Sequence, residues 1–259
     1  MKINAESFRI PKAGCTEAEY EDACSPVERV ETAHQFFRFA IADGATDSSF
    51  SGIWARLLVK AFAEHSDLHP EENFTQTIHQ IVNETRPKWQ RDVGQRELPW
   101  YAAEKAESGA FSSLLGLTIR DQVDQVFGEW QAVAVGDSCL VQVRKNEVIA
   151  NFPIDHSSRF NLMPFLIASN SSYDTKCQEH IKVRKGDIQV DDSFYLMTDA
   201  LACWFMTEHE KGNAPWERLR DLGTSDHQES FRQMIENLRA DRSLKNDDCT
   251  LMRIEIVEA

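Results

Sequence analysis

The segment that most constrains this chain is the run of residues 36–42, which ends directly at Asp43-Gly44. Six of its seven residues are apolar, so the run has the length and composition of an interior strand that stops at a turn. An aspartate at the end of such a strand costs free energy unless a partner compensates its charge. The run therefore predicts a buried strand that delivers a charged group to a polar site.

The rest of the chain alternates between helical and strand-like segments. Apolar residues recur at helical spacing over 51–65, and acidic residues open a second predicted helix at 70–89. Two shorter helices are expected near 216–221 and 227–239. Further strands are expected at 112–120, 129–150, 192–199 and 249–257, with Lys145-Asn146 as the two-residue turn of a hairpin. This order predicts an α+β fold of layered sheets and helices.

Length and charge limit the class of protein. The 259 residues are 42% apolar and contain no repeat and no linker-like tract, so we expect one domain over residues 1–259. The balance of 28 basic and 42 acidic side chains, a net charge of −14, disfavours nucleic acid and membrane surfaces as partners. No apolar run has the length of a signal peptide or a bilayer span, and we expect a cytoplasmic protein. Six scattered cysteines without a C-x-x-C pair disfavour a zinc site and a disulfide framework.

Acidic residues fall at the ends of the predicted strands. They are Asp43 and Asp199, which each end a strand, the pair Asp247-Asp248 before the last strand, and the pair Glu21-Asp22 ahead of the first. If these strand ends meet at one edge, the carboxylates repel one another, and a hard divalent cation removes the conflict. All-oxygen ligand sets favour Mg²⁺, Mn²⁺ or Ca²⁺, and Gly44 would let its backbone carbonyl approach an ion closely. Taken singly, each acid is more often a turn former or a helix cap. Their joint order is what favours a metal site.

Such a site would have a definite chemistry. Two ions about 3.5–4 Å apart that share a carboxylate hold a water between them, lower its pKa and aim it at a phosphorus atom. The chain has no G-x-S-x-G, no C-x₅-R, no P-loop and no H-E-x-x-H. The sequence is therefore consistent with metal-assisted hydrolysis without a protein nucleophile.

Six short motifs resemble, in order, those of the type 2C protein phosphatases, the metal-dependent serine/threonine phosphatase family. They are an E-D pair in "YEDA", D-G in "IADGATDSSFSG", a small-residue strand start in "SGAFSSLLGL", G-D-S in "AVAVGDSCLV", a T-D-G-like "LMTDAL" and a D-N-like "NDDCTLMRI". The resemblance spans about residues 12–257, and the loop after Asp43 is similar to that of bacterial members.

The resemblance implies an αββα sandwich, with two central antiparallel β-sheets flanked by helix pairs. It also implies hydrolysis of phosphoserine and phosphothreonine by water that two Mg²⁺ or Mn²⁺ ions activate. In this family pattern Asp43 would bridge both ions, Gly44 would offer its carbonyl to one of them, and Asp199 and Asp247 would complete the other site. Asp43, Asp199 and Asp247 are thus the implied catalytic set.

The remaining acids have weaker implied roles. Glu21 and Asp22 would hold the second ion directly or through its waters, and Asp248 is a further candidate ligand beside the preferred Asp247. Glu104 and Glu107 fall near the place where some bacterial members hold a third, weaker ion, although ordinary helix-surface acids explain them as well.

Two departures from the family pattern leave the function open. The arginine that usually precedes the E-D pair and binds the substrate phosphate is absent, and Lys12 is the candidate for its role; the glycine of T-D-G is Ala200. A catalytically weak or inactive module that binds or regulates phosphoproteins is therefore the alternative, and a hydrolase of small phosphoesters is a third reading that the negative charge disfavours. The implied partner is a phosphorylated protein, either a serine/threonine kinase or its target, and we expect a monomer.

Overall fold

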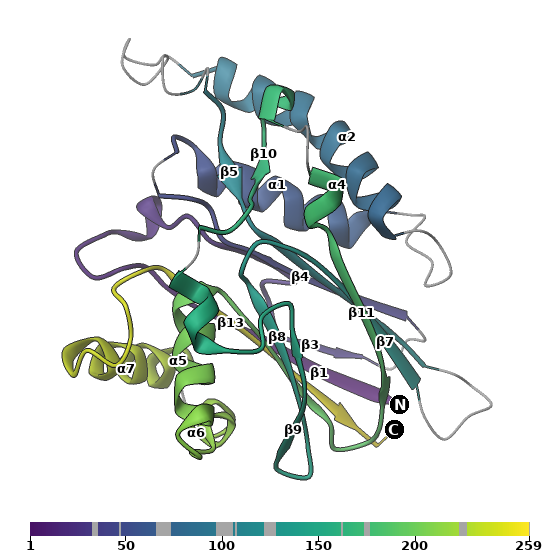
Figure 1. Cartoon of the computed structure of the whole chain (residues 1–259), viewed down its shortest axis with the longest axis vertical. Helices are drawn as coiled ribbons and strands as arrows, with labels where there is room; N and C mark the ends of the chain where they lie inside the picture. Colours follow the sequence, from purple (N-terminus) through teal and green to yellow (C-terminus); the bar gives the residue numbers. More distant parts are fainter. Residues whose placement is uncertain are drawn as a thin grey trace.

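A computed structural model describes most of the chain (Figure 1). The described residues are 1–32, 36–46, 48–65, 74–96, 106, 108–121, 128–161, 163–173, 177–222 and 227–258. None of the helices in these ranges is both long and apolar enough to cross a bilayer. None of the six cysteines, all of which lie within the described ranges, forms a disulfide, and four of them are buried.

Two antiparallel sheets form the centre of the molecule (Figure 1). The six-stranded sheet has the order β3 (Val30–Thr32), β1 (Lys2–Ile10), β13 (Cys249–Val257), β12 (Ser193–Met197), β8 (Cys139–Arg144) and β9 (Glu147–Phe152). The five-stranded sheet has the order β11 (Lys182–Ile188), β7 (Gly128–Val135), β6 (Leu114–Arg120), β4 (Phe36–Ala42) and β2 (Ala23–Ser25). A short pair, β5 (Phe111–Ser112) and β10 (Ile167–Ala168), lies beside the end of β4.

Helices cover the outer face of each sheet (Figure 1). The long helices α1 (Ser51–Glu64) and α2 (Phe74–Gly94) pack on the five-stranded sheet. The helices α5 (Asp199–Glu210), α6 (Pro215–Arg220) and α7 (His227–Ala240) pack on the six-stranded sheet. The short elements are α4 (Cys177–His180), η1 (Glu17–Glu19), η2 (Ser157–Asn161) and η3 (Ser171–Tyr173). This is the αββα sandwich that the family resemblance implies.

The central strands are apolar on both faces because each face packs against a different layer. In β4, Phe39 and Ile41 point between the sheets, whereas Ala40 and Ala42 point to α1 and α2. Successive strand residues face opposite sides, so a strand covered on both sides reads as a continuous apolar run. Because β4 is covered on both faces, residues 36–42 form an almost continuous apolar run, and this run identifies the strand from the sequence.

Most predicted elements are present, with shifted limits. The hairpin turn at Lys145-Asn146 is confirmed, because both residues have the positive φ that a type I′ turn requires. Helix α2 extends to Gly94, beyond its predicted end, while residues 70–73 of that prediction lie outside the described ranges. The segment 129–150, predicted as a hairpin with one turn at Lys145-Asn146, also contains a turn at Gly136, which separates β7 from β8.

Strand β1 was not predicted from the sequence. It pairs with β13 over its whole length, from Lys2 opposite Val257 to Ile10 opposite Cys249. Its first half turns Ile3 and Ala5 between the sheets, but its second half turns Phe8 and Ile10 toward the helices. The change of buried face within one strand breaks the two-residue alternation by which strands are recognised.

Gly116 of β6 provides a test of this packing. A Cβ at this position would overlap the buried ring of Phe62 on α1. We expect Gly116→Ala to lower the free energy of unfolding by about 1–3 kcal/mol, because overpacking strains a close-packed interior. Urea unfolding would measure the difference. Gly94→Ala is the matched control, since a Cβ there meets nothing within 4 Å; equal stabilities of the two variants would contradict the packing described.

Candidate metal centre

Strand pairing brings the predicted acids of distant segments to one edge of the sandwich. Ala23 of β2 lies opposite Ala42 of β4, so Asp22 and Asp43, the next residue on each strand, are neighbours. In the other sheet Met197 of β12 lies opposite Leu251 of β13. Asp199 therefore lies beside the start of β13, which Asp247-Asp248 precede.

Asp22 is the most deeply buried of these acids, with 2% of its surface exposed. Its Oδ2 atom accepts hydrogen bonds from Thr198 Oγ1 at 3.0 Å and Thr250 Oγ1 at 2.7 Å. Its Oδ1 atom has no hydrogen-bond partner among the described residues. Burial raises the pKa of Asp22 well above its usual value, and the charges of Asp248 and Asp199 raise it further. The unpartnered oxygen is free to bind a cation.

Four carboxylates line one cavity of about 420 Å³: Asp43, Asp137, Asp199 and Asp247. Burial raises the pKa of Asp43 well above its usual value, and the neighbouring charges of Asp22 and Asp199 add to this shift. Burial together with Asp199 raises the pKa of Asp137 to about 7. These shifts have one cause, which is that several like charges share a poorly solvated space.

The backbone around Asp43 is held by hydroxyl groups and by a close approach of the chain. Ser112 Oγ and Ser113 N both donate to the Asp43 carbonyl, at 2.9 and 2.8 Å. A Cβ on Gly44 would lie 2.7 Å from the carbonyl oxygen of Glu21, so no larger residue fits there without a shift of the backbone. The glycine thus brings the E-D and D-G loops into contact.

Asp248 connects segments from both ends of the chain. Its Oδ1 accepts from Lys12 N and its Oδ2 from Glu21 N, each at 2.8 Å. Glu21 in turn accepts a hydrogen bond from Ser51 Oγ at 2.6 Å. Both oxygens of Asp248 are used to position backbone, whereas Asp247 lines the cavity.

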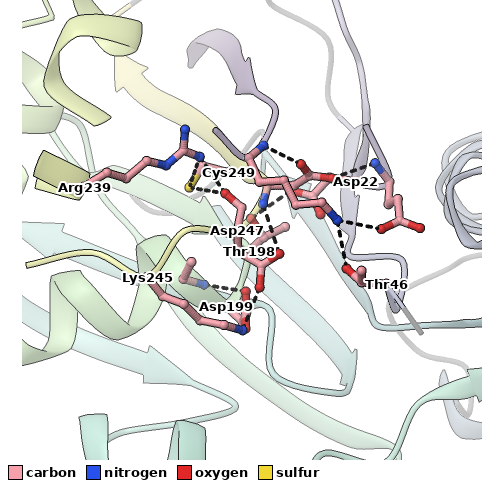
Figure 2. A network of polar contacts seen from close by, with 12 residues as sticks. Asp22, Thr46, Thr198, Asp199, Arg239, Lys245, Asp247 and Cys249 are labelled. Atoms are coloured by element: carbon pink, nitrogen blue, oxygen red, sulfur yellow. Dashed lines mark hydrogen bonds and ion pairs between the residues drawn. The ribbon is translucent and has the colours of Figure 1, made fainter. Parts of the chain in front are cut away.

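Two lysines approach the acidic edge, and Figure 2 labels one of them, Lys245, beside Asp199 and Asp247. The Nζ of Lys245 lies 2.6 Å from Asp247 Oδ2 and 3.7 Å from Asp199 Oδ2. The Nζ of Lys12 lies 3.4 Å from Glu21 Oε2 and 3.3 Å from Thr46 Oγ1. Lys12 was predicted from the sequence, whereas Lys245 was not; its only signal in the sequence is a basic residue two positions before Asp247.

The donor set fits divalent cations that prefer oxygen. The described residues contain no group of three His, Cys, Asp or Glu side chains already arranged as metal ligands. The fit rests instead on the unpartnered Asp22 Oδ1, the carboxylates that raise one another's pKa, and the tight glycine beside them. Hard cations such as Mg²⁺ and Mn²⁺ suit all-oxygen sites of this kind.

Two further predictions from the sequence concern Ala200 and the pair Glu104 and Glu107. Ala200 lies in the first turn of α5, and it is not among the residues with positive φ, so the glycine that the family pattern has at this place is not needed for backbone conformation. Glu104 and Glu107, the candidates for a third ion, lie outside the described residues.

Comparisons with known proteins agree with this architecture. A family model described as Protein phosphatase 2C matches residues 16–251. The serine/threonine phosphatase PstP/Ppp of Mycobacterium tuberculosis has a TM-score of 0.60 at 15% identity, with 100% of each chain covered. Serine/threonine phosphatase Stp1 of Staphylococcus aureus has a TM-score of 0.61 at 12% identity, covering 98% of this chain and 95% of that one. None of the curated proteins compared with the chain matches it.

A further structure of PstP, its catalytic domain in complex with two manganese ions, has a TM-score of 0.56 at 16% identity. The match covers 99% of this chain and 100% of that one.

The raised pKa of Asp137 predicts a pH-dependent stability. Its folded value of about 7 exceeds the ordinary 3.8, so the native state binds this proton more tightly than the unfolded state does. The free energy of unfolding should therefore fall as pH rises between about 4 and 7. We expect metal-stripped protein to show this fall in thermal melts from pH 4 to 8, and Asp137→Asn to show a smaller one. Asp221→Asn, at a carboxylate that is 77% exposed, is the control and should keep the wild-type slope; the wild-type slope in Asp137→Asn would refute the assignment.

Proposed function

Because the chain belongs to the protein phosphatase 2C family and is a metal-dependent serine/threonine protein phosphatase, we propose that the acidic cavity at the ends of β4 and β12 is its active site. The observation that carries this proposal is the convergence of Asp43, Asp137, Asp199 and Asp247 on one cavity, next to an Asp22 oxygen that has no partner among the described residues. A cluster of this charge requires cations, and phosphoester hydrolysis can use them.

We propose that two Mg²⁺ or Mn²⁺ ions bind at this edge. Asp43 would be a ligand of both, Asp199 and Asp247 would complete one site, and Glu21, Asp22 and the Gly44 carbonyl would serve the other. The two manganese ions of the related PstP domain support the number and the metal. Asp248, whose oxygens hold the backbone of Lys12 and Glu21, positions the second site.

The protein's own residues would orient the ligands before any substrate arrives. When bound, the ions would lower the pKa of a water and polarise the phosphoryl group. Thr198 and Thr250 hold one oxygen of Asp22 and leave the other free. Ser112 and Ser113 hold the Asp43 backbone. Such preorganisation reduces the rearrangement that the transition state requires.

The substrate class is a phosphorylated serine or threonine in a protein. We propose that the enzyme opposes a serine/threonine kinase by acting on the kinase or on its target, as a cytoplasmic, monomeric, single-domain protein. The net charge of −14 disfavours nucleic acid as a partner. The non-catalytic alternative gains no support from the comparisons.

Metal-dependent hydrolysis tests the proposal. We expect turnover of p-nitrophenyl phosphate and of a phosphothreonine peptide with Mn²⁺ or Mg²⁺ and none with EDTA. Asp43→Ala and Asp199→Ala should each lower kcat/KM by about 100-fold or more, since loss of even an outer-shell contact at a metal site costs about 10–100-fold. Asp221→Ala is the control, because the Asp221 side chain is 77% exposed, and it should keep the wild-type kcat/KM.

Two results would contradict the proposed function. Turnover that persists in EDTA would exclude metal-activated water. Measurable Mn²⁺ binding by calorimetry without turnover of either substrate would instead favour the regulatory module.

A further inference from the structure

Lys245 is placed differently from every other basic residue at this edge. Among the described residues that line the acidic cavity, it is the only lysine or arginine. Its ammonium forms ion pairs with Asp247 and Asp199, as Figure 2 shows. A cation in this position neutralises part of the charge that the carboxylates share.

The backbone around Lys245 is anchored, whereas its side chain is largely exposed. Asn246 exchanges hydrogen bonds with the backbone of Ala13, at 2.7 and 3.3 Å. Arg239 of α7 donates to the carbonyl of Asp247 at 2.6 Å. The Lys245 side chain itself is 67% exposed. The backbone is thus fixed beside the cavity, and the flexible stem can redirect the ammonium within it.

Lys12, the candidate from the sequence, has a poorer position for the substrate phosphate. It does not line the cavity, and its side chain is only 20% exposed. Its ammonium is engaged by Glu21 and Thr46. Lys12 therefore supports the loop of the E-D pair, whereas Lys245 faces the space that a phosphoryl group would enter.

We propose that Lys245 is the phosphate-binding cation of this enzyme and that, in the ion-free protein, it pairs with Asp199 and Asp247 until those carboxylates coordinate metal. With Asp199 and Asp247 engaged by a cation, the Lys245 ammonium would be released from them and could donate to a non-bridging oxygen of a phosphoryl group in the same cavity. This proposal rests on the proposed function, because it assumes that the cavity receives a phosphomonoester.

Steady-state kinetics of Lys245→Ala and Lys12→Ala test the assignment. We expect Lys245→Ala to raise KM for p-nitrophenyl phosphate and the inhibition constant of inorganic phosphate by about tenfold, the loss typical of one charge-assisted hydrogen bond. Lys12→Ala should change both constants less than Lys245→Ala does, and Lys60→Ala, at a 67% exposed lysine of α1, is the control that should change neither. Lys245→Arg, which keeps a cation on a stem of similar length, should restore most of the affinity.

Two measurements that do not depend on turnover distinguish phosphate binding by Lys245 from a merely structural role. Calorimetry should show Mn²⁺ binding to Lys245→Ala at least as tightly as to wild type, because the ammonium no longer competes for Asp199 and Asp247. Thermal melts should show Lys245→Ala less stable than wild type in EDTA but equal to it in Mn²⁺. A structural role predicts weaker Mn²⁺ binding and a stability loss under both conditions. Lys245→Gln replaces the alanine variant should that variant fail to fold.

The outcomes distinguish this proposal from the proposed function. A wild-type protein without metal-dependent turnover refutes the function, and phosphate binding to the Mn²⁺-loaded protein then still tests Lys245 by calorimetry. Unchanged phosphate affinity in Lys245→Ala, or a tenfold loss confined to Lys12→Ala, overturns the assignment of Lys245.

Discussion

The mutual repulsion of carboxylates gathered at strand ends is the constraint on which the rest of this structure depends. Burial raises the pKa of Asp22, Asp43 and Asp199. The charge of Asp199 raises the pKa of Asp22 and Asp43 further, and the charge of Asp22 adds to the shift of Asp43. Burial of three apolar clusters, one between the sheets and one beneath each helical layer, supplies the stability that offsets this repulsion. The sandwich is therefore a scaffold that holds an unfavourable charge arrangement in a fixed geometry.

Hydroxyl groups and a single lysine moderate that arrangement without removing it. Thr198 and Thr250 donate to one oxygen of Asp22, and Lys245 pairs with Asp199 and Asp247. One ammonium at the rim cannot neutralise the several carboxylates that share the cavity. The cavity thus keeps an excess of negative charge. In the proposed function divalent cations neutralise this charge, and the Lys245 ammonium becomes available for phosphate.

Particular elements show why the fold was largely predictable. The runs at 36–42 and 249–257 lie in strands with both faces covered, and such strands are recognised by composition alone. The Lys145-Asn146 turn was recognised because few residue pairs tolerate positive φ at both positions. Strand β1 was missed because its buried face changes between Ala5 and Phe8, and only its pairing with β13 identifies it as a strand.

The sequence by itself determined which acids follow or precede strands, and hence that Asp43, Asp199 and Asp247 could share a cation. Only the tertiary structure decided which role each residue near these acids has. It uses both oxygens of Asp248 for backbone amides, turns Asp137 into the cavity and brings Lys245 to the carboxylates. The physical reason is that strand position is a local property of composition, whereas side-chain partners come from pairing across two sheets, between residues more than 200 positions apart in the case of Asp248 and Glu21.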